Sequence, residues 1–251
     1  MAERYYWPNN GLQAPDVLTA ELSGDEARHL IRVMRQKPGD VITLFDGNVC
    51  EYRAEITDTR KDRVVLRICE TRHVDTELQR RVTIAVSLPK GDRQKWLVEK
   101  LTELGCRRLI PLQTERGVAQ PTNQVIERLR RQVIEAAKQC NRTMLMQISP
   151  EQTIAECVSG CGGDAMNDGE MVGWIAHPRS DGEFGQRDLT SLMQTALSKN
   201  VLVLIGPEGG FTHQEVEQAV TFGLQPLDLG PRILRVETAA MMLMTVFGLT
   251  G

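Results

Sequence analysis

The chain has 251 residues, of which 41% are hydrophobic and 25% are charged, and its net charge is −3. This composition is ordinary for a globular protein and excludes wholesale disorder and a collagen-like fibre. The sequence contains no run of 18 apolar residues and no apolar signal core near its start, so we expect a cytoplasmic protein without a membrane span.

The net charge conceals an asymmetry along the chain. Residues 1–89 carry a net charge of −1, residues 90–142 carry +6, and residues 143–251 carry −8. A basic segment in an otherwise acidic protein is typical of a surface that attracts phosphate. Charge alone is equally consistent with solvated helix faces.

The pattern before residue 75 predicts short strands and one helix. Residues 40–45 and 49–56 alternate between apolar and polar around a DGN turn, and residues 63–69 form a further strand. Residues 25–35 have helical spacing. We therefore expect a small β-barrel-like module, residues 1–75.

After residue 80, apolar runs of strand length alternate with helical stretches. Strands are predicted at 82–88, 107–112, 171–176, 201–205 and 225–229, and helices at 92–104, 124–141, 188–197, 212–222 and 236–249. This alternation predicts an α/β domain, residues 76–251, with a parallel sheet covered on both faces. The last helix is apolar nearly all round, which predicts burial in the core or against a second subunit.

Two glycine- and proline-containing loops follow predicted strands. VLVLIGPEGGFT at 201–212 runs from a strand into a capped helix, and LDLGPRILRVETAA at 227–240 opens the last helix. Ligands of open parallel sheets bind beyond the carboxyl ends of strands. Neither loop is a Rossmann fingerprint or a P-loop. The carboxylate of Glu208 would repel phosphate, so we expect a neutral or cationic ligand group beside it.

The cysteines and histidines show no metal-ligand spacing. Six cysteines are irregularly placed, and only Cys157 and Cys161 are close together. No second pair completes four zinc ligands. We expect reduced thiols, no disulfide and no metal.

Taken together, these motifs resemble those of the bacterial 16S rRNA uracil-N3 methyltransferases of the SPOUT superfamily. The resemblance rests first on IGPEGGF at 205–211 with LGPRILRVETAA at 229–240, and it covers nearly the whole chain. Further matching stretches are RHLIRVMRQKPGD at 28–40, LFDG at 44–47, KLTELG at 100–105, IPLQTERG at 110–117, EAAKQCNR at 135–142 and HPR at 177–179. The chain departs from the pattern at Met34 and in a glycine-rich insertion around 160–170.

The resemblance implies a PUA-like RNA-binding β-barrel followed by a SPOUT domain with a deep trefoil knot. It also implies S-adenosylmethionine as methyl donor, 16S rRNA in the small ribosomal subunit as substrate, and a homodimer formed through the last helix. The implied cofactor-binding residues lie in the loops that end three strands. They are His177, Gly206, Pro207, Glu208, Gly209, Gly210, Leu229, Gly230, Ile233 and Leu234.

The chemistry of uracil N3 suggests the catalytic residues. The proton on N3 must leave before the nitrogen can attack, and the pyrimidine anion then needs positive charge near its oxygens. Arg235 is the first candidate for that charge and Arg232 the second, and Glu237 is a candidate base that could equally hold an arginine.

Positively charged side chains are the candidate phosphate contacts. They are Arg28, Arg32, Arg35, Lys37, Lys90, Arg93, Arg116 and Arg142. Two alternatives stay open at this stage: a SPOUT methyltransferase of another RNA position, and an RNA-binding assembly factor without catalysis.

Overall fold

The computed structural model describes residues 4–8, 19–161, 171–178, 188, 192 and 200–249. Contacts group the chain into two compact units, the first made of Met1–Glu77 and Ala137–Leu145 and the second of Leu78–Ala136 and Met146–Gly251. The predicted helix at 188–197 and the glycine-rich insertion lie almost wholly outside the described residues.

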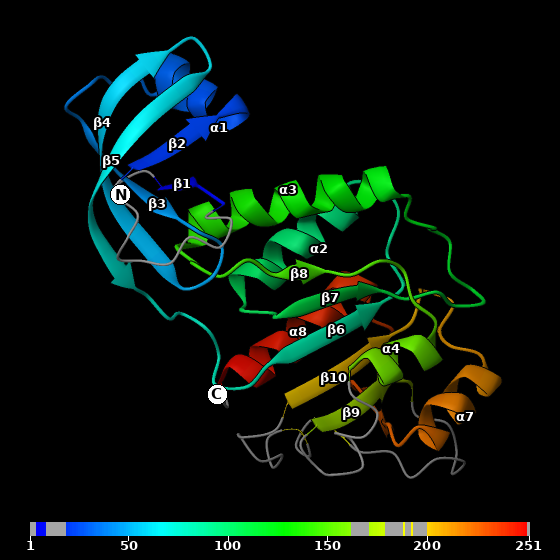
Figure 1. Ribbon diagram of the computed structural model, residues 1–251. Helices are drawn as coiled ribbons and strands as arrows, with labels where there is room; N and C mark the ends of the chain where they lie inside the picture. Colours follow the sequence, from blue (N-terminus) through cyan, green and yellow to red (C-terminus); the bar gives the residue numbers. More distant parts are fainter. Residues whose placement is uncertain are drawn as a thin grey trace. The chain divides into compact units, whose positions relative to one another are not determined.

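The first unit contains a five-stranded sheet in the order β1-β3-β4-β5-β2 (Figure 1). Its strands are β1 (Arg4–Tyr6), β2 (Thr19–Ser23), β3 (Val41–Phe45), β4 (Cys50–Arg60) and β5 (Arg63–His73). β1 is parallel to β3, and the other neighbouring strands are antiparallel. The alternation at 40–45, 49–56 and 63–69 thus corresponds to the consecutive strands β3, β4 and β5.

The buried face of this sheet carries the core of the first unit. Leu44, Tyr52 and Leu66 pack with Leu30 and Trp7, and the rings of Trp7 and Tyr52 meet edge-on with 5.3 Å between their centres. The helix predicted at 25–35 is a short α-helix, α1 (Gly24–Arg28), followed by a π-helical turn, η1 (His29–Val33).

The segment Ala137–Leu145 joins the first unit through buried polar contacts. Arg4 Nη1 donates to the carbonyl oxygens of Ala137 and Arg142, each at 3.4 Å. The Arg142 guanidinium binds Glu77 at two points, with Nε 2.7 Å from Oε1 and Nη2 2.5 Å from Oε2. Arg142 is only 4% exposed. This burial contradicts the prediction that Arg142 contacts RNA phosphates, because its charge is turned inward onto a carboxylate.

The second unit contains six parallel strands in the order β11-β9-β10-β6-β7-β8. They are β6 (Val82–Val86), β7 (Arg108–Pro111), β8 (Gln147–Ile148), β9 (Met171–Ala176), β10 (Asn200–Ile205) and β11 (Gln225–Leu227). All five residues of β6 are buried, as a strand covered on both faces requires. The predicted parallel α/β sheet is confirmed.

Helices pack on both faces of this sheet (Figure 1). They are α2 (Asp92–Glu103), α3 (Asn123–Cys140), α4 (Ile154–Gly160), α7 (His213–Thr221) and α8 (Val236–Leu249). α8 packs against α2, β6 and β10. Leu202 and Leu204 of β10 share a core with side chains of α4 and α7. Successive β10 side chains therefore serve opposite faces.

The path of the chain after β11 determines where the loops meet. β11 lies at the edge of the sheet beyond β9, whereas the next element, α8, packs on β10 and β6. Residues 228–235 therefore cross the carboxyl ends of β9 and β10. The trefoil knot that the resemblance implies stays a prediction.

Other features of the described residues bear on function. None of their helices combines the length and the hydropathy that crossing a membrane would require. None of the six cysteines, all of which lie in the described ranges, forms a disulfide. Within the ranges given above, no three His, Cys, Asp or Glu side chains converge to hold a metal ion.

Candidate active site

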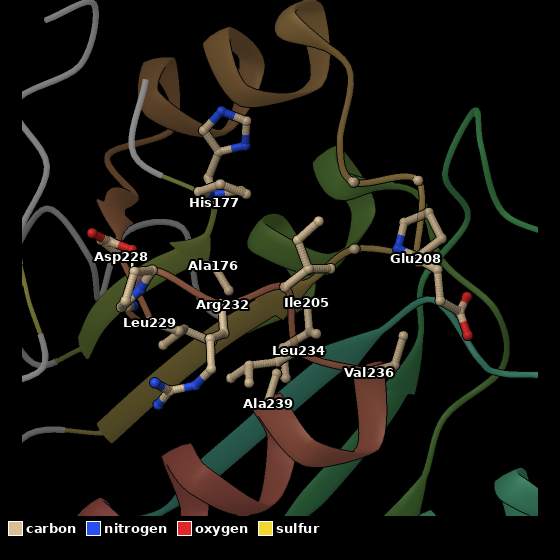
Figure 2. Close-up of a pocket in the computed structure, with 18 residues that line it drawn as sticks. Ala176, His177, Ile205, Glu208, Asp228, Leu229, Arg232, Leu234, Val236 and Ala239 are labelled. Atoms are coloured by element: carbon tan, nitrogen blue, oxygen red, sulfur yellow. Dashed lines mark hydrogen bonds between the residues drawn. The ribbon is translucent and has the colours of Figure 1, made fainter. Parts of the chain in front are cut away.

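A cavity of about 300 Å³ opens at the carboxyl ends of three neighbouring strands (Figure 2). Its walls are the residues that follow β9 (His177 and Pro178), the turn after β10 (Gly206–Gly210) and the crossing segment after β11 (Asp228–Leu234), together with the first turns of α8. The carboxyl ends of β9, β10 and β6 are in register, since Ile205 of β10 pairs with Ala176 of β9 on one side and with Val86 of β6 on the other. The parallel register thus brings loops that are distant in sequence to one place.

The turn after β10 is built on glycine. Gly210 has φ +68°, and its N–H donates to the carbonyl oxygen of Pro207 at 2.8 Å. A Cβ on Gly206 would lie 3.0 Å from the ring of buried Phe211. Thr212 then caps α7 in a reciprocal capping box with Glu215. Three of the five residues of this turn are glycines, which leaves its backbone accessible from the cavity that it lines.

The crossing segment forms the opposite wall. Gly230 has φ +103°, a backbone conformation that is strained for any residue with a side chain. Its N–H donates to Asp228 Oδ1 at 2.9 Å. Leu229 and Leu234 line the cavity with Ile205 of β10, while Ile233 is 91% exposed. The cavity is therefore largely apolar, with polar groups supplied by backbone turns.

His177 places an imidazole at the cavity. Its backbone N–H donates to the Leu227 carbonyl oxygen at 3.0 Å, which fixes the end of β9 beside β11. Its Nδ1 is buried and has no hydrogen-bond partner among the described residues. Burial, and secondly the charge of His213, lower the pKa of His177 below 6.5. The ring is therefore neutral at neutral pH.

This lowered pKa predicts how stability depends on pH. As the pH falls below about 6.5, the unfolded chain takes up the His177 proton first, so stability drops until the lower folded-state pKa is passed. We expect the His177→Gln variant to lose less stability than the wild type over this window. Urea unfolding between about pH 5 and 8 measures the effect. Exposed His73→Gln is the control, and identical curves for His177→Gln and wild type would contradict the assignment.

Charged residues hold the turn after β10 from outside the cavity. Arg93 Nη1 lies 2.7 Å from Glu208 Oε1 and 3.7 Å from Glu237 Oε2, and Arg116 Nη1 donates to the Gly209 carbonyl oxygen at 2.7 Å. The hydrogen bond from Arg93 lowers the pKa of Glu208. In Figure 2 the Glu208 carboxylate points away from Ile205 and Leu229. Arg93 therefore already supplies a cation to this carboxylate, and the expected neutral or cationic ligand group beside Glu208 stays a prediction.

The structure brings together most residues that the sequence singled out. All ten predicted cofactor-binding residues and Arg232 line this one cavity. Arg235 and Glu237 are not among its lining residues. Arg235 is exposed, and its charge reaches Glu208 and lowers the pKa of that carboxyl further. Glu237 is 6% exposed, in the first turn of α8.

Sequence reasoning missed several residues that line the cavity. These are Ala176, Pro178, Ile205, Asp228, Pro231, Val236 and Ala239. Asp228 had a readable signal, since an aspartate two residues before a glycine commonly accepts that glycine's N–H. Val236 and Ala239 had none, because only the crossing segment brings the start of α8 to the cavity.

Apart from the buried Arg142, the predicted phosphate contacts fall into two groups. Arg28, Arg32, Arg35 and Lys37 are exposed in the first unit, and Lys90 is exposed in the second. Arg93 and Arg116 are committed to the turn after β10.

Comparisons with known proteins identify the family. Residues 76–248 match the model of an RNA methyltransferase domain, and residues 22–69 match that of an RNA methyltransferase PUA domain. Ribosomal RNA small subunit methyltransferase E from Bacillus subtilis is 30% identical over 245 residues, which cover 95% of this chain and 93% of that protein. The chain belongs to this family of RNA methyltransferases.

Solved structures of methyltransferases share the whole fold. A putative methyltransferase from Legionella pneumophila, solved with bound SAM, has a TM-score of 0.81 and 28% identity, and the match covers 100% of this chain and 98% of that one. Ribosomal RNA small subunit methyltransferase E from Neisseria gonorrhoeae, bound to S-adenosyl methionine, has a TM-score of 0.77 and 28% identity, covering 98% and 96%. The family resemblance drawn from the motifs is confirmed.

Proposed function

We propose that this protein transfers a methyl group from S-adenosylmethionine to N3 of a uridine in the 16S rRNA of the small ribosomal subunit. One observation carries the proposal: the two loops that resemble the family signature form, with the end of β9, a single cavity in the methyltransferase domain. We assign RNA binding to residues 1–75 and catalysis to residues 76–251. A ribosomal substrate places the reaction in the cytoplasm.

The cavity suits S-adenosylmethionine. Ile205, Leu229 and Leu234 offer an apolar slot for a flat ring, and the backbone of the Gly206–Gly210 turn offers hydrogen-bonding groups at its edge. The buried Nδ1 of His177 still needs a partner, which a polar group of the ligand would supply. His177 is neutral, so it does not repel a cation. The bound cofactor supplies an electrophilic methyl group on a positively charged sulfur.

The protein's own contribution is positioning and charge. N3 lies on the pairing edge of uracil, so the base must be unpaired or extruded from a helix to react. Holding N3 in line with the methyl group contributes about 7–11 kcal/mol in well-oriented reactions. Arg235 is the exposed cation at the start of α8, next to the cavity, and we assign it to the uracil oxygens, with Arg232 second. Glu237 is buried against Arg93, which argues for a structural charge and against the base.

The Arg235→Ala variant tests this assignment. We expect kcat to fall by roughly 100- to 1,000-fold, because a donor that meets charge developing in the transition state is lost. The dissociation constant for S-adenosylmethionine should stay within about threefold. Single-turnover kinetics with direct cofactor-binding measurements separate the two effects. A normal kcat would remove Arg235 from the mechanism.

We also propose a homodimer formed through α8. Ile233 and Leu249 are 91% and 78% exposed, and Met241 and Met242 of α8 are only partly covered. Apolar side chains left open beside an apolar helix suit a self-complementary interface. Sedimentation equilibrium of the wild type and of a Leu249→Asp variant tests it.

Methyl transfer from labelled S-adenosylmethionine tests the main proposal. The substrate is small ribosomal subunits that lack the modification, and the product is digested to nucleosides. Formation of 3-methyluridine supports the proposal. Cofactor binding with transfer to another atom would identify a methyltransferase of a different RNA position. Absence of cofactor binding would favour an RNA-binding assembly factor.

A further inference from the structure

Resting on the proposed function, we propose that Arg93 and Arg116 are positioning residues of the cofactor site and do not contact RNA phosphates. Both bind the turn Gly206–Gly210, and neither is among the residues that line the cavity. The sequence predicted that both contact RNA, because it shows that these side chains are positively charged but does not show which groups they bind.

Arg93 ties two walls of the cavity together. It belongs to the first turn of α2 and binds Glu208 in the turn after β10 as well as Glu237 in the first turn of α8. The Glu237 side chain is only 9% exposed, and Oε2 makes no hydrogen bond among the described residues. A buried carboxylate needs a nearby cation, and Arg93 supplies it. Without Arg93, both the turn and the start of α8 lose their common anchor.

Arg116 holds the same turn at its next residue. Arg116 Nη1 donates a hydrogen bond to the Gly209 carbonyl oxygen at 2.7 Å. The aliphatic part of Arg116 also packs against Gly209, since a Cβ added to that glycine would lie 3.4 Å from Arg116 Cδ. The preceding residue, Glu115, donates its N–H to Glu215 Oε1 at 2.9 Å. Glu215 completes the capping box with Thr212 at the start of α7. The loop after β7 therefore binds the turn and the start of the helix that follows it.

The geometry separates the inside of the turn from the outside. The backbone of Gly206–Gly210 lines the cavity, while the Glu208 carboxylate points away from Ile205 and Leu229 (Figure 2). Neither arginine lines the cavity, so each would influence the cofactor by holding this turn in place. The side chains of Arg93 and Glu208 are 37% and 41% exposed. Solvent therefore weakens this ion pair, and we expect its loss alone to have a moderate effect.

Single variants distinguish positioning from RNA contact. We expect Arg93→Gln and Arg116→Gln each to raise the dissociation constant for S-adenosylmethionine about fivefold, with unchanged KM for small subunits and unchanged salt dependence of RNA binding. A phosphate contact would give the reverse: unchanged cofactor affinity, a higher KM for RNA, and a salt slope reduced by about one. That second outcome would overturn the proposal. Isothermal titration of the cofactor and filter binding of RNA at several salt concentrations measure both.

Paired variants test the mechanism of the anchor. Glu208→Gln added to Arg93→Gln should cause no further loss of cofactor affinity, because both changes remove the same ion pair. Glu237→Gln added to Arg93→Gln should recover part of the loss, because the buried carboxylate no longer lacks a cation. Additive losses in both pairs would contradict the anchor.

A matched control removes the same charge elsewhere. Arg81 is exposed and directly precedes β6. It therefore lies at the amino-terminal ends of the strands, whereas the cavity lies at their carboxyl ends. Arg81→Gln should leave cofactor affinity unchanged. If the wild type itself fails to bind S-adenosylmethionine, the proposed function fails; if the wild type binds it and Arg93→Gln binds equally well, only this inference fails.

Discussion

The Arg142→Ala variant should lower the free energy of unfolding by about 3–5 kcal/mol, the usual cost of removing one partner of a buried ion pair. Arg142 is 4% exposed and binds Glu77 through two hydrogen bonds. Its removal leaves the Glu77 carboxylate, itself only 15% exposed, without its cation. The backbone carbonyl of residue 142 also accepts from Arg4, so the effect should spread along the buried polar contacts of the first unit.

Urea unfolding at neutral pH measures this change. The control is Arg60→Ala, which breaks the pair with Asp58 in the same unit, where the two side chains are 70% and 47% exposed. We expect a change below about 1 kcal/mol there. If Arg142→Ala were as stable as the wild type and bound RNA less tightly, the sequence-based role as a phosphate contact would return.

The Ala239→Phe variant should abolish most cofactor binding. Ala239 is 5% exposed and lines the cavity from α8, as does Leu234 from the crossing segment; both are labelled in Figure 2. A phenyl ring there occupies space that the ligand needs. Because the ring excludes part of the ligand from the cavity, we expect the dissociation constant to rise about a hundredfold, which corresponds to about 2.8 kcal/mol of lost binding free energy.

Two further measurements make that result interpretable. A thermal melt followed by circular dichroism shows whether Ala239→Phe is folded. Thr221→Phe adds the same ring to an exposed position of α7 outside the cavity and should bind S-adenosylmethionine like the wild type. A folded Ala239→Phe protein with unchanged affinity would place the cofactor elsewhere.

The parallel sheet and its last helix could be predicted because their signals are local. β9 at Met171–Ala176 and α8 at Val236–Leu249 have the predicted bounds, since each is a continuous apolar run with polar or glycine-rich flanks. β10 is buried along nearly its whole length, and the glycine turn that follows marks its end. The residues of the candidate site follow from the same rule, because parallel strands deliver their loops to one edge.

Elements held by distant partners could not be predicted. β1 has three residues and exists because it pairs with β3, and β8 has two residues beside β7. α4 was missed although Thr153 and Glu156 have capping-box spacing, which is a readable signal. Its seven residues are too few to show a helical period.

The partners of charged residues were equally hidden. Arg142 and Glu77 are 65 positions apart, and Arg93 and Glu208 are 115 apart. Sequence reports that such a residue is charged, whereas the fold decides whether its charge meets solvent, a carboxylate or a ligand. The wrong expectation for Arg142 and the unforeseen pairing of Glu208 with Arg93 share this cause.

The two-segment construction of the first unit has a consequence for synthesis on the ribosome. Its strands are complete once Glu77 has been made, but Ala137–Leu145, which supplies partners for Arg4 and Glu77, is translated roughly 70 residues later. At ~5–20 residues per second this is a delay of about 4–14 seconds, during which the Glu77 carboxylate lacks the guanidinium of Arg142. The segments that line the cavity are translated later still. A nascent chain therefore cannot form the whole cavity before Ala239 has been made.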